Sequence, residues 1–219
     1  MTLILPQRTG YSRAETVSDL VVHALGLGAA LLAVPVLVTL TWARGEALPL
    51  LGVSIYGATL IAMILCSTLY NMNHSARWSP VLRRLDHSAI YLKIAGTYTA
   101  FALASAQPAG WFLVWIWIWG CALTGAGLRT LAPDSWRGAA IGLYLVMGWS
   151  GAVAGGALFG DMSSRAFGLI LTGGILYTAG FAFYLSPRLR FHRTIWHLFV
   201  MTASAVFFAA VMVHVPAQR

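Results

Sequence analysis

Seven apolar segments of about 20 residues or slightly more divide this chain, and only short polar pieces separate them. Because roughly 20 apolar residues cross the hydrocarbon core of a bilayer as a helix, each segment is expected to be a transmembrane helix. Seven such helices use most of the 219 residues and leave no room for a separate soluble domain. The expected spans are 17–42, 47–70, 86–106, 110–128, 137–159, 166–186 and 194–215.

Charged residues make up only 9% of the chain, and the mean hydropathy is +0.76. Soluble domains carry about a quarter charged residues, and disordered chains combine low hydrophobicity with high net charge, so both classes are excluded. The predicted fold class is an all-α, seven-transmembrane helix bundle. We expect a cytoplasmic N-terminal tail at 1–16, one membrane domain at 17–215 and a short external tail at 216–219.

The basic residues are unevenly distributed between the two ends of the predicted bundle. Ten of the fourteen fall on one side: Arg8, Arg13, Arg77, Arg83, Arg84, Arg129, Arg137, Arg188, Arg190 and Arg193. Because positively charged loops stay in the cytoplasm, the N-terminus is predicted to lie inside and the C-terminus outside. Because the basic residues lie in alternate loops, they form no continuous basic surface. The net charge of +8 therefore does not indicate nucleic-acid binding.

Small residues suit close packing of the helices. Gly151 and Gly155 have the GxxxG spacing that lets two membrane helices approach closely. In a chain this rich in glycine, the spacing favours packing within one bundle. A homo-oligomer stays an open alternative that the sequence does not indicate, and the lipid bilayer is the expected partner.

Ionisable side chains inside spans are costly, so each is a candidate functional residue. Glu15, Asp19 and His23 share one face of the first span through i, i+4 spacing. With the predicted orientation, the polar groups of four spans fall in one layer near the cytoplasmic surface. The candidate site residues are Glu15, Asp19, His23, Ser67, Asn71, His74, Asp86, Lys93 and His197.

Each candidate also has an ordinary structural interpretation. Glu15 and Asp19 suit the start of a helix, where the dipole favours carboxylates. Asp86 suits a helix cap or an ion pair with a neighbouring base. Lys93 suits an ion pair with an acid or a side chain that extends to the interface, and Ser67 suits a bond to a backbone carbonyl.

Histidine and aspartate on facing helices also raise the question of a metal. A catalytic zinc ion takes three protein ligands and keeps one position open for water. His192 and His197 point about 140° apart around one helix and cannot easily bind one ion together. A zinc site would therefore need His197 with His74 or His23 and a carboxylate, which is a weak signal.

Three motifs stand out together: STLYN (67–71), LRRLDHSAIYLKIAGTYTAF (82–101) and IWHLFV (195–200). With the Glu15, Asp19, His23 and Gly26 face, they resemble the hemolysin III family, the bacterial branch of the progestin and adipoQ receptor superfamily. The resemblance covers essentially the whole chain. It implies seven helices with the N-terminus inside and, from the adiponectin-receptor relatives, a zinc ion near the cytoplasmic side and slow lipid amidase chemistry of the ceramidase type.

That family pattern has a serine and a histidine four residues apart, an aspartate, and two histidines four residues apart. Ser67, Asp86 and His197 match the serine, the aspartate and the second histidine of the pair. Asn71 and Arg193 stand where the pattern has histidine, so the resemblance leaves two of three zinc ligands missing. An arginine has no lone pair to offer and would repel the cation.

Three functions follow as hypotheses. The first is a family-typical membrane protein acting in membrane homeostasis or, as the family name suggests, in permeabilisation. The second is a zinc-dependent lipid amide hydrolase, with Asp86 orienting a metal-bound water, Ser67 aiding the oxyanion and His74 replacing a lost ligand. The third is a metal-free transporter, channel or sensor with a relay of ionisable side chains: Lys93, Asp86, Glu15 and Asp19.

Overall fold

The computed structural model describes residues 12–73, 75–105, 108–131, 137–154 and 162–215. Within these ranges the chain forms seven α-helices and no strand, which confirms the predicted all-α bundle. The helices are α1 (Arg13–Trp42), α2 (Ala47–Met72), α3 (Ser79–Ala104), α4 (Pro108–Leu131), α5 (Arg137–Ala154), α7 (Ser164–Tyr184) and α8 (His192–His214).

Five of these helices, α1, α2, α4, α7 and α8, are long and apolar enough to cross a membrane. Their outer faces expose large apolar side chains, such as Leu25 and Leu32 of α1. Such a surface is costly in water and favourable in lipid, as expected of membrane-spanning helices. The apolar part found in α5, Gly138–Gly151, is shorter.

The predicted spans match the helices closely, except at α3 and α5. Helix α3 begins at Ser79, not at residue 86, because Pro80 suits a first helical turn and the helix continues through Arg83 and Arg84. A span predicted from hydropathy stops at charged residues such as these. The helix itself can extend beyond the hydrocarbon layer and include them. The described part of α5 ends at Ala154, and the predicted end of that span lies outside the described residues.

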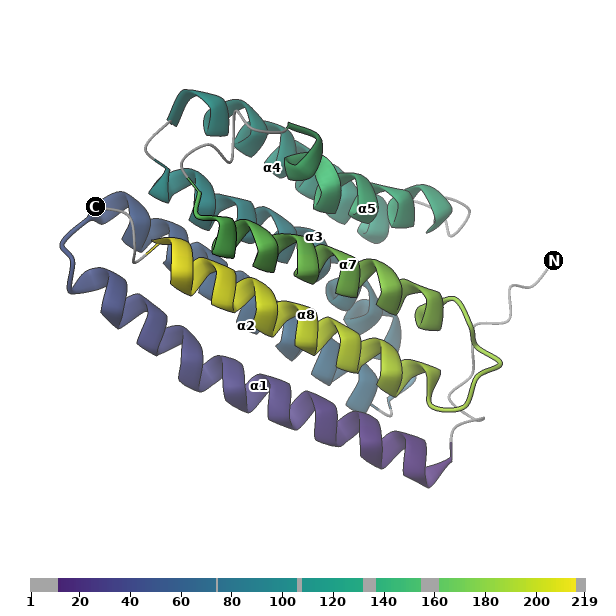
Figure 1. Ribbon diagram of the computed structural model, residues 1–219. Coiled ribbons are helices and arrows are strands. Elements are labelled where there is room, and N and C mark those ends of the chain that lie inside the picture. Colours follow the sequence, from purple (N-terminus) through teal and green to yellow (C-terminus); the bar gives the residue numbers. More distant parts are fainter. Residues whose placement is uncertain (1–11, 74, 106–107, 132–136, 155–161, 216–219) are drawn as a thin grey trace.

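Helix α3 lies in the interior of the bundle and packs against α2, α4, α5 and α8. Helix α1 packs against α2 and α8, and α7 packs against α8. Figure 1 shows α1 along one side of the bundle and α4 with α5 along the opposite side. The buried polar residues of α3, among them Lys93, Thr97 and Thr99, are therefore surrounded by other helices rather than by lipid.

Tyrosine side chains of α3 fix the position of α5. The hydroxyl of Tyr91 donates to the backbone carbonyl of Ala140 at 2.7 Å, and its ring lies 4.2 Å from the ring of Tyr144. Tyr144 in turn donates to the carbonyl of His87 at 2.8 Å. The Tyr91 ring also lies against the backbone of Gly125 in α4, where a Cβ atom would overlap it.

We expect Gly125→Ala to destabilise the protein by about 1–3 kcal/mol, because the added methyl group forces the buried Tyr91 ring to move. Gly127→Ala is the matched control, since a Cβ atom there meets nothing within 4 Å. Thermal unfolding of the purified protein in mild detergent measures both. Equal melting temperatures for the two variants would contradict the packing described for α3 and α4.

The start of α1 is held beside the start of α8. Ser12 caps α1 by accepting from the Glu15 backbone N–H at 3.2 Å, and its own N–H donates to the Glu15 carboxylate at 2.9 Å. The second carboxylate oxygen of Glu15 accepts from the backbone N–H of Phe191 at 2.9 Å. Phe191 directly precedes α8 and has a left-handed φ of 60°. This link brings the polar face of α1 against the first turns of α8.

Candidate functional site

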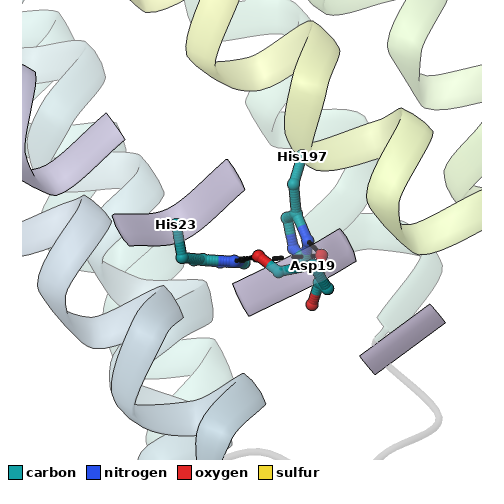
Figure 2. A group of neighbouring side chains, drawn as sticks. All are labelled: Asp19, His23 and His197. Atoms are coloured by element: carbon teal, nitrogen blue, oxygen red, sulfur yellow. Dashed lines mark hydrogen bonds and ion pairs between the residues drawn. The ribbon is translucent and has the colours of Figure 1, made fainter. Parts of the chain in front are cut away.

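A buried aspartate and a buried histidine join α1 to α8. Nδ1 of His197 lies 2.5 Å from Oδ1 of Asp19, and both residues are less than 10% exposed. A carboxylate can only accept, so the His197 ring donates through Nδ1. In a neutral imidazole the other ring nitrogen, Nε2, then carries the lone pair. Figure 2 shows the two side chains directed toward each other, with His23 alongside.

His23 extends this network from α1 to α2. Its Nδ1 lies 2.8 Å from the backbone carbonyl oxygen of Asp19, and its Nε2 lies 3.2 Å from the Ser67 hydroxyl. Since the carbonyl can only accept, His23 donates through Nδ1, and a neutral ring accepts from Ser67 through Nε2. The His23 and His197 rings lie edge to face, with centroids 4.4 Å apart.

Ser67 is where the network meets the other polar residues of α2 and α3. The side-chain amide of Asn71 donates to the Ser67 carbonyl at 2.9 Å and to its hydroxyl at 3.3 Å. The Asp86 carboxyl lies beside the Ser67 hydroxyl, within electrostatic range of His197 and Arg193. Four helices thus contribute to one polar cluster.

A cavity of about 660 Å³ borders this cluster. Most of its wall is apolar, which suits an organic molecule with a hydrocarbon part. The cluster residues on the wall are Ser67, Asn71, Asp86, Arg193 and His197. Asp19 and His23 lie behind this wall, so they position His197 and Ser67 from the protein side.

The three-histidine zinc site of the family pattern does not fit these side chains. Asn71 uses its amide group as a donor to Ser67, and Arg193 brings a positive charge with no lone pair. Among the described residues, Asp19, His23 and His197 form one cluster whose ligand atoms lie within 4.8 Å of one another. Two ligands of one tetrahedral zinc ion stand roughly 3.3 Å apart, as follows from metal–ligand distances near 2.0 Å. The 2.5 Å contact between Asp19 and His197 is a hydrogen bond instead, and both ring nitrogens of His23 already have partners.

Three other sequence candidates have different outcomes. Glu15 belongs to the cap of α1 and to the contact with Phe191, as its structural interpretation predicted. His74 lies outside the described residues, so its predicted role as a replacement ligand stays a prediction. Asn71 is placed in the cluster, although its role there is as a donor.

Lys93 is placed away from the polar cluster. It lies two helical turns beyond Asp86 in α3, and its ammonium group stands over the rings of Tyr177 and Phe207, 4.7 Å and 4.5 Å from their centroids. Only 3% of the residue is exposed. In the described ranges no acid forms an ion pair with it, so the expected pairing with an acid is not found there.

Two contacts at this end of the bundle were not predicted from the sequence. Arg129 was used only as one of the basic residues that indicate the membrane orientation, but it contacts Nδ1 of His87 and joins the end of α4 to α3. The hydroxyls of Ser18 and Thr194 lie 3.0 Å apart and join α1 to α8 beside the Asp19–His197 contact. Serine, threonine and arginine are common near helix ends, so their spacing alone gave no signal for these pairs.

The chain matches a family model described as Haemolysin-III related over residues 12–208. It is 36% identical over 205 residues to Hemolysin-3 of Bacillus cereus, covering 92% of each chain. It is 33% identical to the Hemolysin-3 homolog of Bacillus subtilis (strain 168) over 201 residues, 90% of this chain and 93% of the relative. The human monocyte to macrophage differentiation factor is 30% identical over 166 residues, 72% of this chain and 67% of that protein.

The family match and the apolar helices together show that this chain is a multi-pass integral membrane protein. The chain belongs to the haemolysin-III-related family, which confirms the resemblance noted in its motifs.

Proposed function

We propose that this protein serves membrane homeostasis by hydrolysing an amide or ester of a lipid-like molecule held in its cavity. We place it in the bacterial inner membrane with the polar cluster facing the cytoplasm. The observation that carries the proposal is the 2.5 Å contact between Asp19 and His197, on a histidine that borders the cavity. A carboxylate that fixes one nitrogen of a histidine leaves the other available as a general base.

The proposed reaction uses water as the nucleophile. Nε2 of His197 takes a proton from water, and the water oxygen forms a bond to the substrate carbonyl carbon. The carbonyl oxygen becomes an oxyanion as its double bond opens. When the bond to the leaving nitrogen or oxygen breaks, the leaving group takes the proton from His197. The products are a carboxylic acid and an amine or alcohol.

One of the two departures from the zinc pattern supplies what this reaction needs. Arg193 borders the cavity with its positive charge, whereas the amide group of Asn71 already donates to Ser67. Hydrogen-bond donors and fixed positive charge stabilise an oxyanion, a task that a metal ion performs in a zinc hydrolase. Asp19 carries the negative charge that stabilises the imidazolium form of His197 after proton transfer.

The test is hydrolysis of a fluorescent N-acyl sphingosine and a matched acyl ester by the purified protein in mild detergent. We expect His197→Gln to lower the rate by about 100-fold or more, because the general base is lost. His214→Gln is the matched control, since His214 is a buried histidine at the far end of α8. A strong chelator should leave the parental rate unchanged. Cleavage no faster than in His197→Gln, or a rate abolished by the chelator, would refute the proposal.

The name of the Bacillus relatives, Hemolysin-3, makes permeabilisation a second candidate. It is tested by adding the purified protein to red cells, beside a heat-denatured sample and the detergent alone. Lysis by the native sample only, unaffected by His197→Gln, would favour this function over hydrolysis. The metal-free transport hypothesis is tested by Lys93→Leu, because a relay that includes Lys93 and Asp86 would then lose ion flux into proteoliposomes; an unchanged flux would exclude it.

A further inference from the structure

Lys93 is a second polar feature of the cavity, and the proposed hydrolysis does not use it. Its ammonium group lies against Phe207, which follows His197 by ten residues in α8. That separation corresponds to about 15 Å along a helix axis. Lys93 therefore stands at a different level of the cavity from the polar cluster, and it cannot take part in the same proton transfer.

The surroundings of Lys93 favour a cation but do not neutralise it. Two aromatic faces contact the ammonium group, and aromatic faces attract cations. Within the described residues no acid is paired with it. A buried cation in a bundle without a counter-ion is costly, and an anionic ligand entering the cavity would remove that cost.

The cavity wall indicates what kind of anion fits. The cavity wall that includes Lys93 is formed largely by apolar side chains, among them Ile94, Phe101 and Ile170. A volume of about 660 Å³ is far larger than an inorganic ion and suits a molecule with a hydrocarbon chain. The arginines of the wall lie elsewhere: Arg83 and Arg129 near the His87 end of α3, and Arg193 at the start of α8. A single positive charge matches a head group with a single negative charge.

We infer that Lys93, flanked by Tyr177 and Phe207, binds the monoanionic head group of a single-chain amphiphile inside the cavity. The hydrocarbon chain lies along the apolar wall. This site is separate from the Asp19–His197 centre, and binding there requires no bond to be broken.

The experiment measures binding of hexadecanoate to the protein by isothermal titration in mild detergent. Hexadecanol serves as the uncharged ligand of the same length. All titrations use the His197→Gln background, so turnover is absent and a failure of the hydrolysis proposal leaves the result readable. We expect about one hexadecanoate per chain, and at least tenfold weaker binding in Lys93→Met, because a charged hydrogen bond is lost. Lys93→Arg should retain most of the affinity.

Arg165→Met is the control, because it removes one positive charge from an exposed position outside the cavity wall. It should bind hexadecanoate as the parent does. The inference is overturned if Lys93→Met binds hexadecanoate as well as the parent while melting at the same temperature. It is overturned equally if hexadecanol binds as tightly as hexadecanoate, or if acetate or chloride competes at the same concentrations as hexadecanoate.

Discussion

Asp19→Asn is expected to lower the turnover number of the proposed amide or ester hydrolysis by about two to four orders of magnitude, with little change in KM. The Asp19 carboxylate accepts the Nδ1 proton of His197 at 2.5 Å. An amide at this position can offer its N–H group to Nδ1 and force the proton onto Nε2, the nitrogen that must act as the base. It also removes the negative charge that stabilises the imidazolium form. Steady-state kinetics over a range of pH measure the effect.

Glu15→Gln is the control for this variant, because it removes a carboxylate one turn earlier on the same face of α1. Glu15 caps the helix and binds the Phe191 backbone, so its loss should lower the melting temperature and leave the turnover number nearly unchanged. A structural role for Asp19 would instead reduce the amount of folded protein and leave the pH profile of the remaining activity as it was. That outcome, or equal turnover in both variants, would show that Asp19 does not tune His197.

Introducing the two histidines of the family pattern, in the double variant Asn71→His with Arg193→His, is expected to create a zinc-binding site. Together with His197 these side chains complete a set of three nitrogen ligands with one open position, the usual arrangement of a catalytic zinc ion. Removing the arginine also removes the charge that repels the cation. Elemental analysis of protein purified in mild detergent should give about one zinc per chain for the double variant, against well below one for the parent.

Adding His197→Gln to the double variant provides the control, since it leaves only two of the three ligands and should again lower the zinc content. Each single restoration should give an intermediate affinity. A parent protein that already carries one zinc per chain would refute the metal-independent reaction. A double variant without zinc would show that positions 71, 193 and 197 are not placed so that three histidines there can bind one ion, as the resemblance implies.

Periodic and compositional features of the chain were enough to predict most of the fold. Apolar stretches long enough for a bilayer predicted the helices, because every backbone polar group in lipid must be bonded within its own helix. The exception, the early start of α3 at Ser79, arises because hydropathy measures how far the apolar layer extends, while helix formation depends on local backbone bonds. Motifs around Ser67, Asp86 and His197 also predicted the family that the comparisons show.

The partners within the site could not be predicted in the same way. Helical spacing placed Asp19 and His23 on one face, but it could not reveal that Asp19 contacts His197, a residue 178 positions away. The same holds for Lys93, which was expected to pair with an acid or to extend to the interface, and which lies between two aromatic rings from α7 and α8. Residue spacing along one helix determines the direction in which each side chain points from that helix. A contact between side chains of two helices depends also on how the helices are rotated and shifted relative to each other.

By itself the sequence determined that this chain is a seven-helix membrane protein of the haemolysin-III-related family, with its ionisable groups concentrated near one end. Only the tertiary structure decided that Asp19 holds His197 at the edge of a cavity, and that Lys93 stands apart from this centre. The reason is that the hydrophobicity and the helical periodicity of a segment depend on its own residues, so both can be predicted from the sequence of that segment. Hydrogen bonds between buried side chains need distances near 3 Å, and those are set only when all helices pack together.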